Sequence, residues 1–575
     1  MKKINLSLLM KIVSLGICPA LLIVACYLGV FFGVDLSDVT YSVTNYMFLG
    51  EIEGSWIYAT FLANLVGSGL VHLSGGSLLV MNILTRLILV ALVLLPYYQL
   101  RKYVPWPLLF SGELVAIGLS WCPSVILYNY LTYLMMTGAL LFLFFGLVKD
   151  KNYHFICAGL LFGINILTRF SNLTECVFIL VVWYASILDH DKKWIKRTLL
   201  SLGGYLAGCL IAVGILYLAG GPEAIPQMAD WLIGLLTGNN KDANDYSMKG
   251  MLLGVFRYYM ENIRWFAGLI VLFGFGNVLY LLLREKYTWL KRILFTGSLG
   301  LLLVWYYRNG VITTIYRNTG AFFHLAVVMI MLSLLVYILM LAMPGMKREE
   351  RILGFMAFII LIIAPLGSKN HLFTCMNQLY LVAPITIMGI CRLIGLAAKQ
   401  KIEEPIMLAG VVLLVILTVQ GILFRANYVF GDEEPGAHET MITNIDSLDG
   451  MLAREEDVLA LEGLVEASTS LRKENASLIT FGNIPGIHYV LSMKPALSNA
   501  WPDLDSYSVS DFKMDLYTIN DKQNTYVIIT RDVVNGFVQN MMNPSTKEYA
   551  LAEFLYGNRY QALYTNDQFI LYGCQ

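Results

Sequence analysis

The sequence predicts a polytopic α-helical membrane protein with an α/β domain at its C-terminal end. Its 575 residues are 57% hydrophobic and 14% charged, with a mean hydropathy of +0.65. Soluble globular chains are about 45–50% apolar and about 25% charged. The apolar residues also gather in runs of about 18 or more, the length that crosses a bilayer core of about 30 Å. These observations exclude a soluble enzyme, a nucleic-acid binder and a fibrous protein.

Charge divides the chain into two parts. Residues 1–424 carry 30 Lys and Arg against 19 Asp and Glu, whereas residues 425–575 carry 10 against 21. We therefore expect a transmembrane domain over 1–424 and an acidic domain, of the size of one ordinary domain, over 425–575. In the second part a helical stretch at 439–473 and strands at 477–481, 525–530 and 568–572 predict a small α/β layer structure.

About thirteen spans account for the apolar runs of the first part. They are predicted at 8–33, 77–99, 104–121, 124–148, 153–168, 172–188, 198–219, 262–283, 293–307, 321–343, 352–366, 372–397 and 406–424. The aromatic segment 56–67 is too short and too interrupted by Gly for a span, and an interfacial helix along the membrane surface fits it better.

Basic residues predict the orientation of these spans. With the N-terminus in the cytoplasm, nineteen Lys and Arg of the first part fall in cytoplasmic loops and eight on the opposite side. Because basic residues favour the cytoplasmic side, the N-terminus is predicted to be cytoplasmic. An odd number of spans then places the C-terminal domain outside the cell membrane.

The first outer loop, residues 34–76, contains acidic residues and no Lys or Arg. Asp35 and Asp38 are three residues apart, which places them on one face of a helix at the membrane surface. A carboxylate beside low-dielectric material suits a general base or a cation ligand. The alternative is that both residues only cap the helix that begins near Leu36.

Several cations lie at the predicted outer ends of spans, where a charge is costly unless it is paired or functional. These residues are Arg169, Arg308, Arg317 and Lys369. Arg binds phosphate through two parallel hydrogen bonds, and Lys acts as a point charge. Each residue could instead be a snorkelling side chain. Arg86, Lys11 and Arg392 lie nearer to span interiors, and we interpret them as pairing or snorkelling.

Known catalytic motifs give no competing assignment. The chain has no P-loop ending in Gly-Lys-Ser/Thr, no HExxH and no GxSxG, and its seven His residues are scattered. ATP-driven transport and zinc proteolysis are therefore not supported by the sequence.

The order of these features resembles the GT-C class of membrane glycosyltransferases, which use polyprenyl-phosphate-linked sugars. One span is followed by the acidic loop with Asp35, Asp38 and Tyr41, by an interfacial aromatic segment, by about ten further spans and by an outer α/β domain. The segments 128–133, 158–165, 168–172 and 365–370 also resemble stretches of uncharacterised bacterial proteins of this kind. The chain departs from better-known members in lacking an adjacent pair of acids in the loop.

The resemblance implies transfer of a sugar from a polyprenyl-phosphate donor to an acceptor hydroxyl of a glycan, lipid or protein, on the outer face of the membrane. It makes Asp38 the first choice and Asp35 the second for the base. Arg169, with Arg317 or Lys369, would hold the phosphate. The further substrate-binding candidates are Tyr41, Asn172, Arg308 and Asn370. No cofactor is identified, and a divalent metal is left open, with Asp35 and Asp38 as its ligands if one binds.

Two alternatives to an enzyme remain open. A flippase or transporter for a lipid-linked oligosaccharide would also need outer cations and a lateral opening, but it would need a continuous polar path to the cytoplasm rather than a base. A non-catalytic protein of polysaccharide assembly would tolerate the loss of both aspartates. Nucleic acid is not an expected partner of any of them, whereas membrane lipids are.

Overall fold

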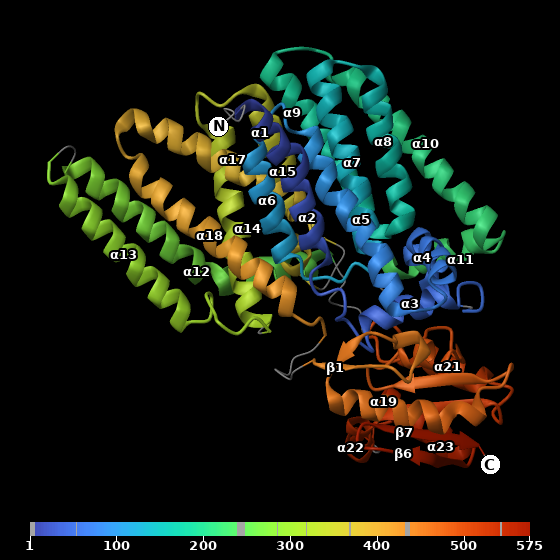
Figure 1. The fold of residues 1–575 in the computed structure, drawn as a ribbon. Coiled ribbons are helices and arrows are strands. Elements are labelled where there is room, and N and C mark those ends of the chain that lie inside the picture. The colour runs from blue at the N-terminus through green and yellow to red at the C-terminus, as the bar shows by residue number, and fades with distance from the viewer. Residues whose placement is uncertain are drawn as a thin grey trace.

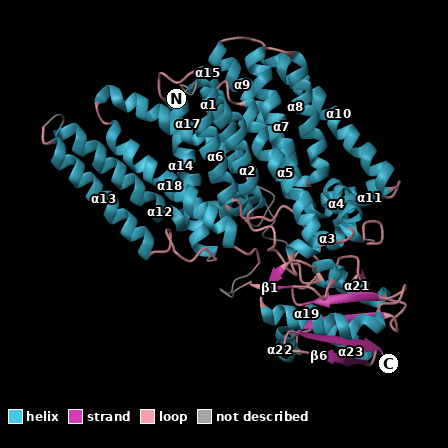
Figure 2. Ribbon diagram, viewed as in Figure 1, coloured by secondary structure: helices cyan, strands magenta, loops and turns pink. Residues whose placement is uncertain are grey.

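The computed structural model describes residues 6–52, 54–237, 248–283, 286–317, 319–366, 370–431, 438–540 and 543–574. It consists of a large helical bundle and a smaller α/β domain at one end of that bundle (Figures 1 and 2). We call this end of the bundle its domain-facing end. The predicted architecture of a helical membrane protein with a C-terminal α/β region is confirmed.

The bundle contains a series of helices that follow the apolar runs of the sequence. They are α1 (Leu6–Ile12), α2 (Cys18–Tyr27), α3 (Asp38–Met47), α4 (Phe61–Ser74), α5 (Leu78–Gln99), α6 (Trp106–Leu119), α7 (Leu127–Lys149), α8 (Asn152–Thr168), α9 (Ile179–Asp189), α10 (Trp194–Gly220), α11 (Ala224–Thr237), α12 (Met248–Leu283), α13 (Thr288–Arg308), α14 (Thr319–Ala342), α15 (Arg348–Ile363), α16 (Phe373–Met376), α17 (Leu379–Ala397) and α18 (Glu403–Asn427). A π-helical turn at Val13–Ile17 joins α1 to α2, and a 3-10 segment at Phe170–Phe178 leads into α9.

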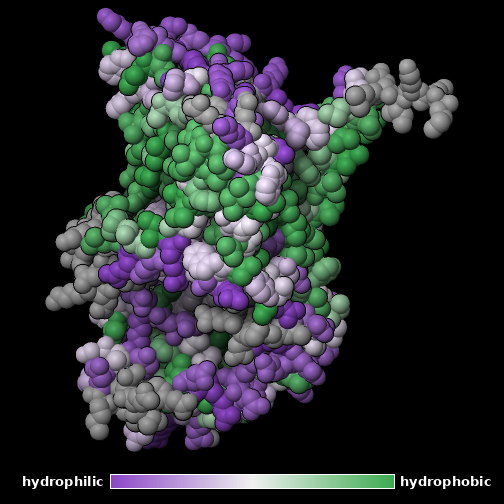
Figure 3. Space-filling model, turned by 90° about the vertical axis from the view of Figure 1, so that its left-hand side faces the viewer, coloured by the Kyte–Doolittle hydropathy of each residue, from purple (hydrophilic) through white to green (hydrophobic). Residues whose placement is uncertain are grey.

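Each of the thirteen predicted spans falls on one of these helices or on two that follow each other. Among the described residues, ten helical stretches are long and apolar enough to cross a membrane, and α6 and α8 are shorter apolar helices. One of the ten is 57–74, the region for which an interfacial helix was expected. On the face that Figure 3 shows, hydrophobic side chains form a band across the bundle, and hydrophilic side chains gather above it and over the α/β domain below. The protein is therefore a multi-pass membrane protein.

Glycine pairs set the closest packing within the bundle, between α8 and α10. A Cβ added to Gly159 would lie 2.0 Å from the carbonyl oxygen of Ser201, and one added to Gly208 would lie 2.3 Å from that of Leu160. Gly159 and Gly163 on α8, and Gly204 and Gly208 on α10, each repeat at a spacing of four residues. Small residues at this spacing let membrane helices approach backbone to backbone. The resulting van der Waals contact stabilises the helix pair, because the hydrophobic effect does not drive helices together in lipid.

The C-terminal domain is a five-stranded mixed sheet with helices packed on it. Its strands run in the order β4 (Lys494–Pro495), β3 (Ser477–Phe481), β5 (Thr525–Thr530), β7 (Phe569–Cys574) and β6 (Tyr560–Thr565). The first three strands are parallel and the last two are antiparallel to their neighbours. The accompanying helices are α19 (Glu455–Ser468), α20 (Ile487–Leu491), α21 (Val509–Thr518), α22 (Arg531–Asn540) and α23 (Lys547–Gly557).

All three predicted strands are present, but the predicted helical stretch at 439–473 is wrong in extent. Its first half forms the antiparallel strand pair β1 (Thr440–Met441) and β2 (Leu452–Ala453), and only α19 is α-helical. The backbone N–H of Leu452 donates to the carbonyl oxygen of Phe31, at 2.9 Å. The segment before α19 is thus held in an extended form by a contact with the bundle. The local sequence predicted a helix there because helix propensity does not include such long-range contacts.

The domain is fastened to the first loop of the bundle. The N–H of Gly486 donates to the carbonyl oxygen of Leu36 at 2.8 Å, and a Cβ on Gly486 would lie 1.6 Å from Oγ1 of Thr40. The hydroxyl of Tyr489 lies 2.6 Å from the carbonyl oxygen of Gly76, to which it donates. Because these contacts lie on both sides of α3 and α4 in sequence, the α/β domain covers the loop that carries the acidic residues.

We expect Gly486→Ala to destabilise the protein by about 1–3 kcal/mol, because the added methyl group has to displace Thr40 from the contact that docks the domain. Thermal unfolding of the detergent-solubilised protein measures this as a lower Tm. The matched control is Gly557→Ala, since a Cβ at Gly557 meets nothing within 4 Å. Equal Tm values for the two variants would contradict the docking role of Gly486.

Candidate functional site

Asp35 caps the helix that carries Asp38. Its carboxylate accepts hydrogen bonds from the N–H of Ser37 at 3.0 Å, from the hydroxyl of Ser37 at 2.5 Å and from the N–H of Val39 at 2.9 Å. Burial raises the pKa of Asp35, and the hydrogen bonds from Ser37 and Val39 oppose that rise. For Asp35 the capping interpretation therefore describes what the carboxylate does, and its lone pairs are largely occupied by the protein itself.

Asp38 is the first residue of α3, and its carboxylate is in a different situation. It is partly buried, and none of the described residues donates a hydrogen bond to it. Burial, and secondarily the charge of Asp35, raise the pKa of Asp38 to about 6. A partly buried carboxylate without a donor is available to a ligand or to a proton, which is the condition that a general base has to meet.

Arg169 lies close to the same group of residues as Asp38. Its guanidinium carbon is 5.6 Å from the centre of the Tyr128 ring, and one of its nitrogens donates to Oδ1 of Asn129 at 3.4 Å. Both the Asp38 carboxylate and Arg169 are within electrostatic range of Tyr128 and of the Cys122 thiol. The acid of the first loop and a cation from 131 residues later in the chain therefore converge on the segment 122–129, and the described contacts include no ion pair between these two side chains.

Tyr41 connects this region to the α/β domain. Its hydroxyl donates to Oδ1 of Asn499 at 3.3 Å, and its ring makes an edge contact with Trp501, with the ring centres 5.3 Å apart. Burial raises the pKa of Tyr41 to about 12, so its hydroxyl stays protonated. Trp501 is only 9% exposed, so its ring is packed inside the protein beside Tyr41.

The amide of Asn172 is engaged inside the bundle. It donates to Oγ1 of Thr132 at 2.7 Å and to the carbonyl oxygen of Asn165 at 2.9 Å. Asn165 in turn donates to the carboxylate of Glu175, at 2.9 and 3.0 Å to the two oxygens. Asn172 therefore fastens the 3-10 segment onto α7 and α8, close to Arg169 in the chain, and the buried Glu175 is a polar residue that sequence reasoning did not single out.

The remaining predicted substrate-binding residues do not gather around Asp38 in the described contacts. Arg308 is exposed at the end of α13, and no contact among the described residues joins it to α3. Arg317 is partly buried in the turn before α14, beside Tyr316, whose ring packs against Phe424. Asn370 is exposed. Lys369 lies outside the described residues.

The acidic pair offers only part of a metal site. Among the described residues no group of three or more His, Cys, Asp or Glu side chains could hold a metal ion. Two carboxylates are available at Asp35 and Asp38, and the oxygens of Asp35 already accept three hydrogen bonds from the loop. Asp38 is therefore the carboxylate of this pair that is left for a metal ion, and water or a substrate phosphate would have to supply most of the other ligands.

The structure corrects the interpretation of Arg86. This residue lies in α5 and is 6% exposed, but it does not pair with an acid or reach towards water. Its guanidinium donates to the carbonyl oxygens of Cys26, Leu28 and Gly29, at 2.9, 2.6 and 2.9 Å. A second cation, Arg425, lies within electrostatic range of it. Arg392, in contrast, pairs with Glu350, as the interpretation of pairing expected.

Comparisons with known proteins give a limited picture. No family model matches the chain, and no curated protein matches it. Among solved structures the chain is similar to ArnT from Cupriavidus metallidurans bound to undecaprenyl phosphate, with 10% identity, a TM-score of 0.43 and coverage of 98% of this chain and 97% of ArnT. The apo state of ArnT gives 10% identity, a TM-score of 0.42 and coverage of 99% and 98%. ArnT is a GT-C glycosyltransferase, the class that the sequence resembles, but at this identity and TM-score no residue, ligand or activity of ArnT is transferred to the present chain.

Proposed function

We propose that this protein is an integral-membrane glycosyltransferase that moves a sugar from a polyprenyl-phosphate donor to an acceptor hydroxyl at the domain-facing end of its bundle, on the outer face of the membrane. The observation that carries the proposal is the Asp38 carboxylate, which is partly buried, lacks a hydrogen-bond donor among the described residues and has its pKa raised to about 6. A carboxylate held in this way without a structural partner is costly, and catalysis is a reason for a protein to keep one.

In the proposed reaction Asp38 removes the proton from the acceptor hydroxyl. The acceptor oxygen forms a bond to the anomeric carbon, and the bond between that carbon and the phosphate oxygen breaks, leaving its electron pair on the polyprenyl phosphate. A base is most effective when its pKa lies near the working pH, and burial moves Asp38 in that direction. Arg169, near the same Tyr128 ring, stabilises the negative charge that grows on the leaving phosphate.

The other residues near Asp38 have supporting roles in this proposal. Asp35 fixes the start of α3 and, through its charge, contributes to the raised pKa of Asp38. Tyr41 joins α3 to Asn499 and Trp501 of the α/β domain, so that the domain covers the approach of the acceptor. The acceptor belongs to the glycans, lipids or proteins that reach this face of the membrane.

Asp38→Asn should lower transfer by about 10²–10⁴-fold, because the amide cannot accept the proton of the acceptor hydroxyl. The measurement is release of polyprenyl phosphate from a panel of polyprenyl-phosphate sugars in membranes that contain the protein and its native acceptors. The control is Asp449→Asn, which changes an exposed aspartate of the α/β domain. Full transfer by Asp38→Asn would remove Asp38 as the base, whereas absence of transfer by the parent protein would leave the flippase or the assembly protein, which need no base.

The stability of the protein should depend on pH through Asp38. The pKa of Asp38 is about 6 in the folded protein against an ordinary value of 3.8, so the folded protein binds this proton more tightly than the unfolded chain does. The free energy of unfolding therefore falls as the pH rises from 3.8 to about 6, and the full penalty is present above about pH 6. The penalty disappears below pH 3.8, where Asp38 is protonated in both states. Asp38→Asn should be more stable than the parent by about 1–2 kcal/mol at pH 7.5, and the difference should shrink at pH 4.5.

Thermal unfolding in detergent at the two pH values measures this difference, and Asp449→Asn again provides the comparison. A gain in Tm for Asp38→Asn that is the same at both pH values would show that the raised pKa is not its cause.

Arg169→Ala should lower kcat by about 10²-fold, because the cation interacts with charge that is largest in the transition state. The same transfer assay measures it, with Arg169→Lys expected to retain part of the rate. Arg257→Ala serves as the matched control, since Arg257 is an exposed arginine of α12. A change confined to KM, with kcat unaltered, would assign Arg169 to substrate binding alone and contradict its role at the leaving phosphate.

A further inference from the structure

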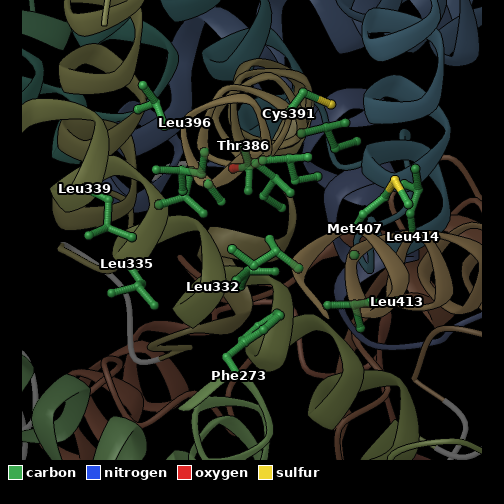
Figure 4. A pocket seen from close by; sticks show the side chains of 18 of the residues that line it. Phe273, Leu332, Leu335, Leu339, Thr386, Cys391, Leu396, Met407, Leu413 and Leu414 are labelled. Carbon is green, nitrogen blue, oxygen red and sulfur yellow. The ribbon is translucent and has the colours of Figure 1, made fainter. Parts of the chain in front are cut away.

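A large apolar cavity lies between α12, α14, α17 and α18, with Val115 of α6 at its inner end. Its volume is about 870 Å³, and Figure 4 shows that most of the labelled side chains around it are hydrocarbon. Among the described residues that line it, only Asn277, Thr386 and Lys399 are polar. The Thr386 hydroxyl already donates to the carbonyl oxygen of Val382, at 2.8 Å. The wall therefore offers few partners to water and suits a hydrocarbon chain.

The cavity is closed towards the α/β domain by a backbone contact between α6 and α18. A Cβ added to Gly118 would lie 2.7 Å from the carbonyl carbon of Gly421. On these two helices the cavity is lined by Val115 and by residues up to Leu417, which lie on the side of this contact away from the domain. A ligand in the cavity is therefore separate from the site around Asp38, and it enters from another direction.

The opposite end of the cavity, which we call its mouth, lies at the end of the bundle away from the α/β domain. Pro344 and Gly345 after α14, and Lys399 in the 3-10 turn after α17, line the mouth and are exposed. Along α18 the lining includes Met407 and Val411, which are 48% and 55% exposed. The cavity therefore reaches the lipid-facing surface of the bundle, and a chain from the surrounding leaflet can enter it.

The length of the cavity matches one hydrocarbon chain of that leaflet. On α14 its lining runs from Met329 to Met343, and on α18 it runs from Ile402 to Leu417. At 1.5 Å per residue, each of these stretches is about 21–23 Å long. One leaflet contributes about 15 Å of hydrocarbon, which is half of a bilayer core of about 30 Å. A full acyl chain therefore fits along the cavity.

Two opposite charges at the mouth are not neutralised by the protein. Lys399 forms no ion pair among the described residues. Glu403 lies one turn before Met407 on the same face of α18, and its Oε2 is buried without a hydrogen-bond donor. The neighbouring Glu404, in contrast, accepts a hydrogen bond from Nε of Arg292 at 3.0 Å. A buried carboxylate oxygen without a donor is costly, so a ligand that brings a donor is stabilised there.

The polar groups at the mouth ask for a ligand with both charges. Lys399 suits a phosphate, whereas Glu403 needs a positively charged donor. Oδ1 of Asn277, which lines the cavity, is also buried without a donor. A primary ammonium supplies both the charge and the N–H groups. A quaternary ammonium has the charge but no N–H, and a glycerol head group has hydroxyls but no positive charge.

We infer that the protein binds one molecule of phosphatidylethanolamine in this cavity, with an acyl chain between α14 and α18, the phosphate beside Lys399 and the ammonium beside Glu403. Charged pockets between membrane helices are known sites for lipid head groups. The lipid comes from the leaflet opposite to the α/β domain, and the site does not depend on the proposed function.

Binding of three phospholipids with identical chains to the full-length protein in detergent tests the inference. The probes are phosphatidylethanolamine, phosphatidylcholine and phosphatidylglycerol, and native mass spectrometry measures the affinity of each. We expect phosphatidylethanolamine to bind at least tenfold more tightly than the other two and to raise the Tm. Equal affinity for all three would overturn the head-group assignment and leave unselective filling of an apolar space. Tightest binding of phosphatidylglycerol would overturn the role of Glu403.

Two variants separate the parts of the head group. Glu403→Gln should abolish the preference for phosphatidylethanolamine over phosphatidylglycerol, because the amide carries no charge for the ammonium. Lys399→Gln should weaken binding of all three lipids, since each carries the phosphate. The controls are Glu349→Gln, a partly buried acid in the first turn of α15, and Lys196→Gln, an exposed lysine of α10. An unchanged preference in Glu403→Gln would overturn the ammonium site.

Gly410→Phe tests the position of the chain. Gly410 lines the cavity, and a Cβ there meets only the side chain of Ile390, at 3.6 Å, so the ring enters the space. Binding of phosphatidylethanolamine should weaken at least tenfold. Gly395→Phe should leave it unchanged, since Gly395 is an exposed residue of α17 where a Cβ meets nothing within 4 Å. The Tm of each lipid-free variant shows that it is folded.

Equal affinity of the parent and Gly410→Phe would overturn the placement of the acyl chain. Asp38→Asn should bind phosphatidylethanolamine as the parent does, so that failure of the proposed reaction and failure of this site are seen in separate measurements.

Discussion

A charged side chain at the edge of an apolar helical bundle needs hydrogen bonds or a counter-charge, and this requirement organises the domain-facing end of the protein. Asp35 meets it with three hydrogen bonds from its own loop, and Arg86 meets much of it with three backbone carbonyls. Asp38 and Arg425 do not meet it with any described residue. Charges left in this state are expensive in low dielectric.

The α/β domain belongs to this site as much as the bundle does. It holds the loop before α3 through Gly486 and meets Tyr41 through Asn499 and Trp501, so residues more than 400 positions apart form one surface. The cover limits the contact of Asp38 with water, and burial is the main cause of its raised pKa.

The turn at Trp121–Pro123 lies near both Asp38 and Arg425, the two charged side chains without a hydrogen-bond partner among the described residues. Cys122 is within electrostatic range of Asp38, Arg169 and Arg425, and its neighbours line a small cavity with Arg86 and Arg425. The backbone of this turn is itself fixed by Asn377, whose Oδ1 accepts from the N–H groups of Trp121 and Cys122 at 2.9 and 3.0 Å. In the proposed reaction this fixed turn would hold Asp38 and Arg169 in a constant relation to each other, which is what positional catalysis requires.

The sequence by itself determined the membrane class, the helices and the three main strands, because long apolar runs and short β-branched runs report burial along the local chain. It also singled out Asp35, Asp38 and Arg169 as candidates, whose roles stay predictions. Local pattern could not decide which aspartate is free, since Asp35 and Asp38 differ only in the hydrogen bonds that folding gives them. It read Arg86 as a side chain that pairs or snorkels, whereas in the fold Arg86 donates to three backbone carbonyls. These outcomes depend on which helix ends meet in space, and that was decided only by the tertiary packing of helices far apart in the chain.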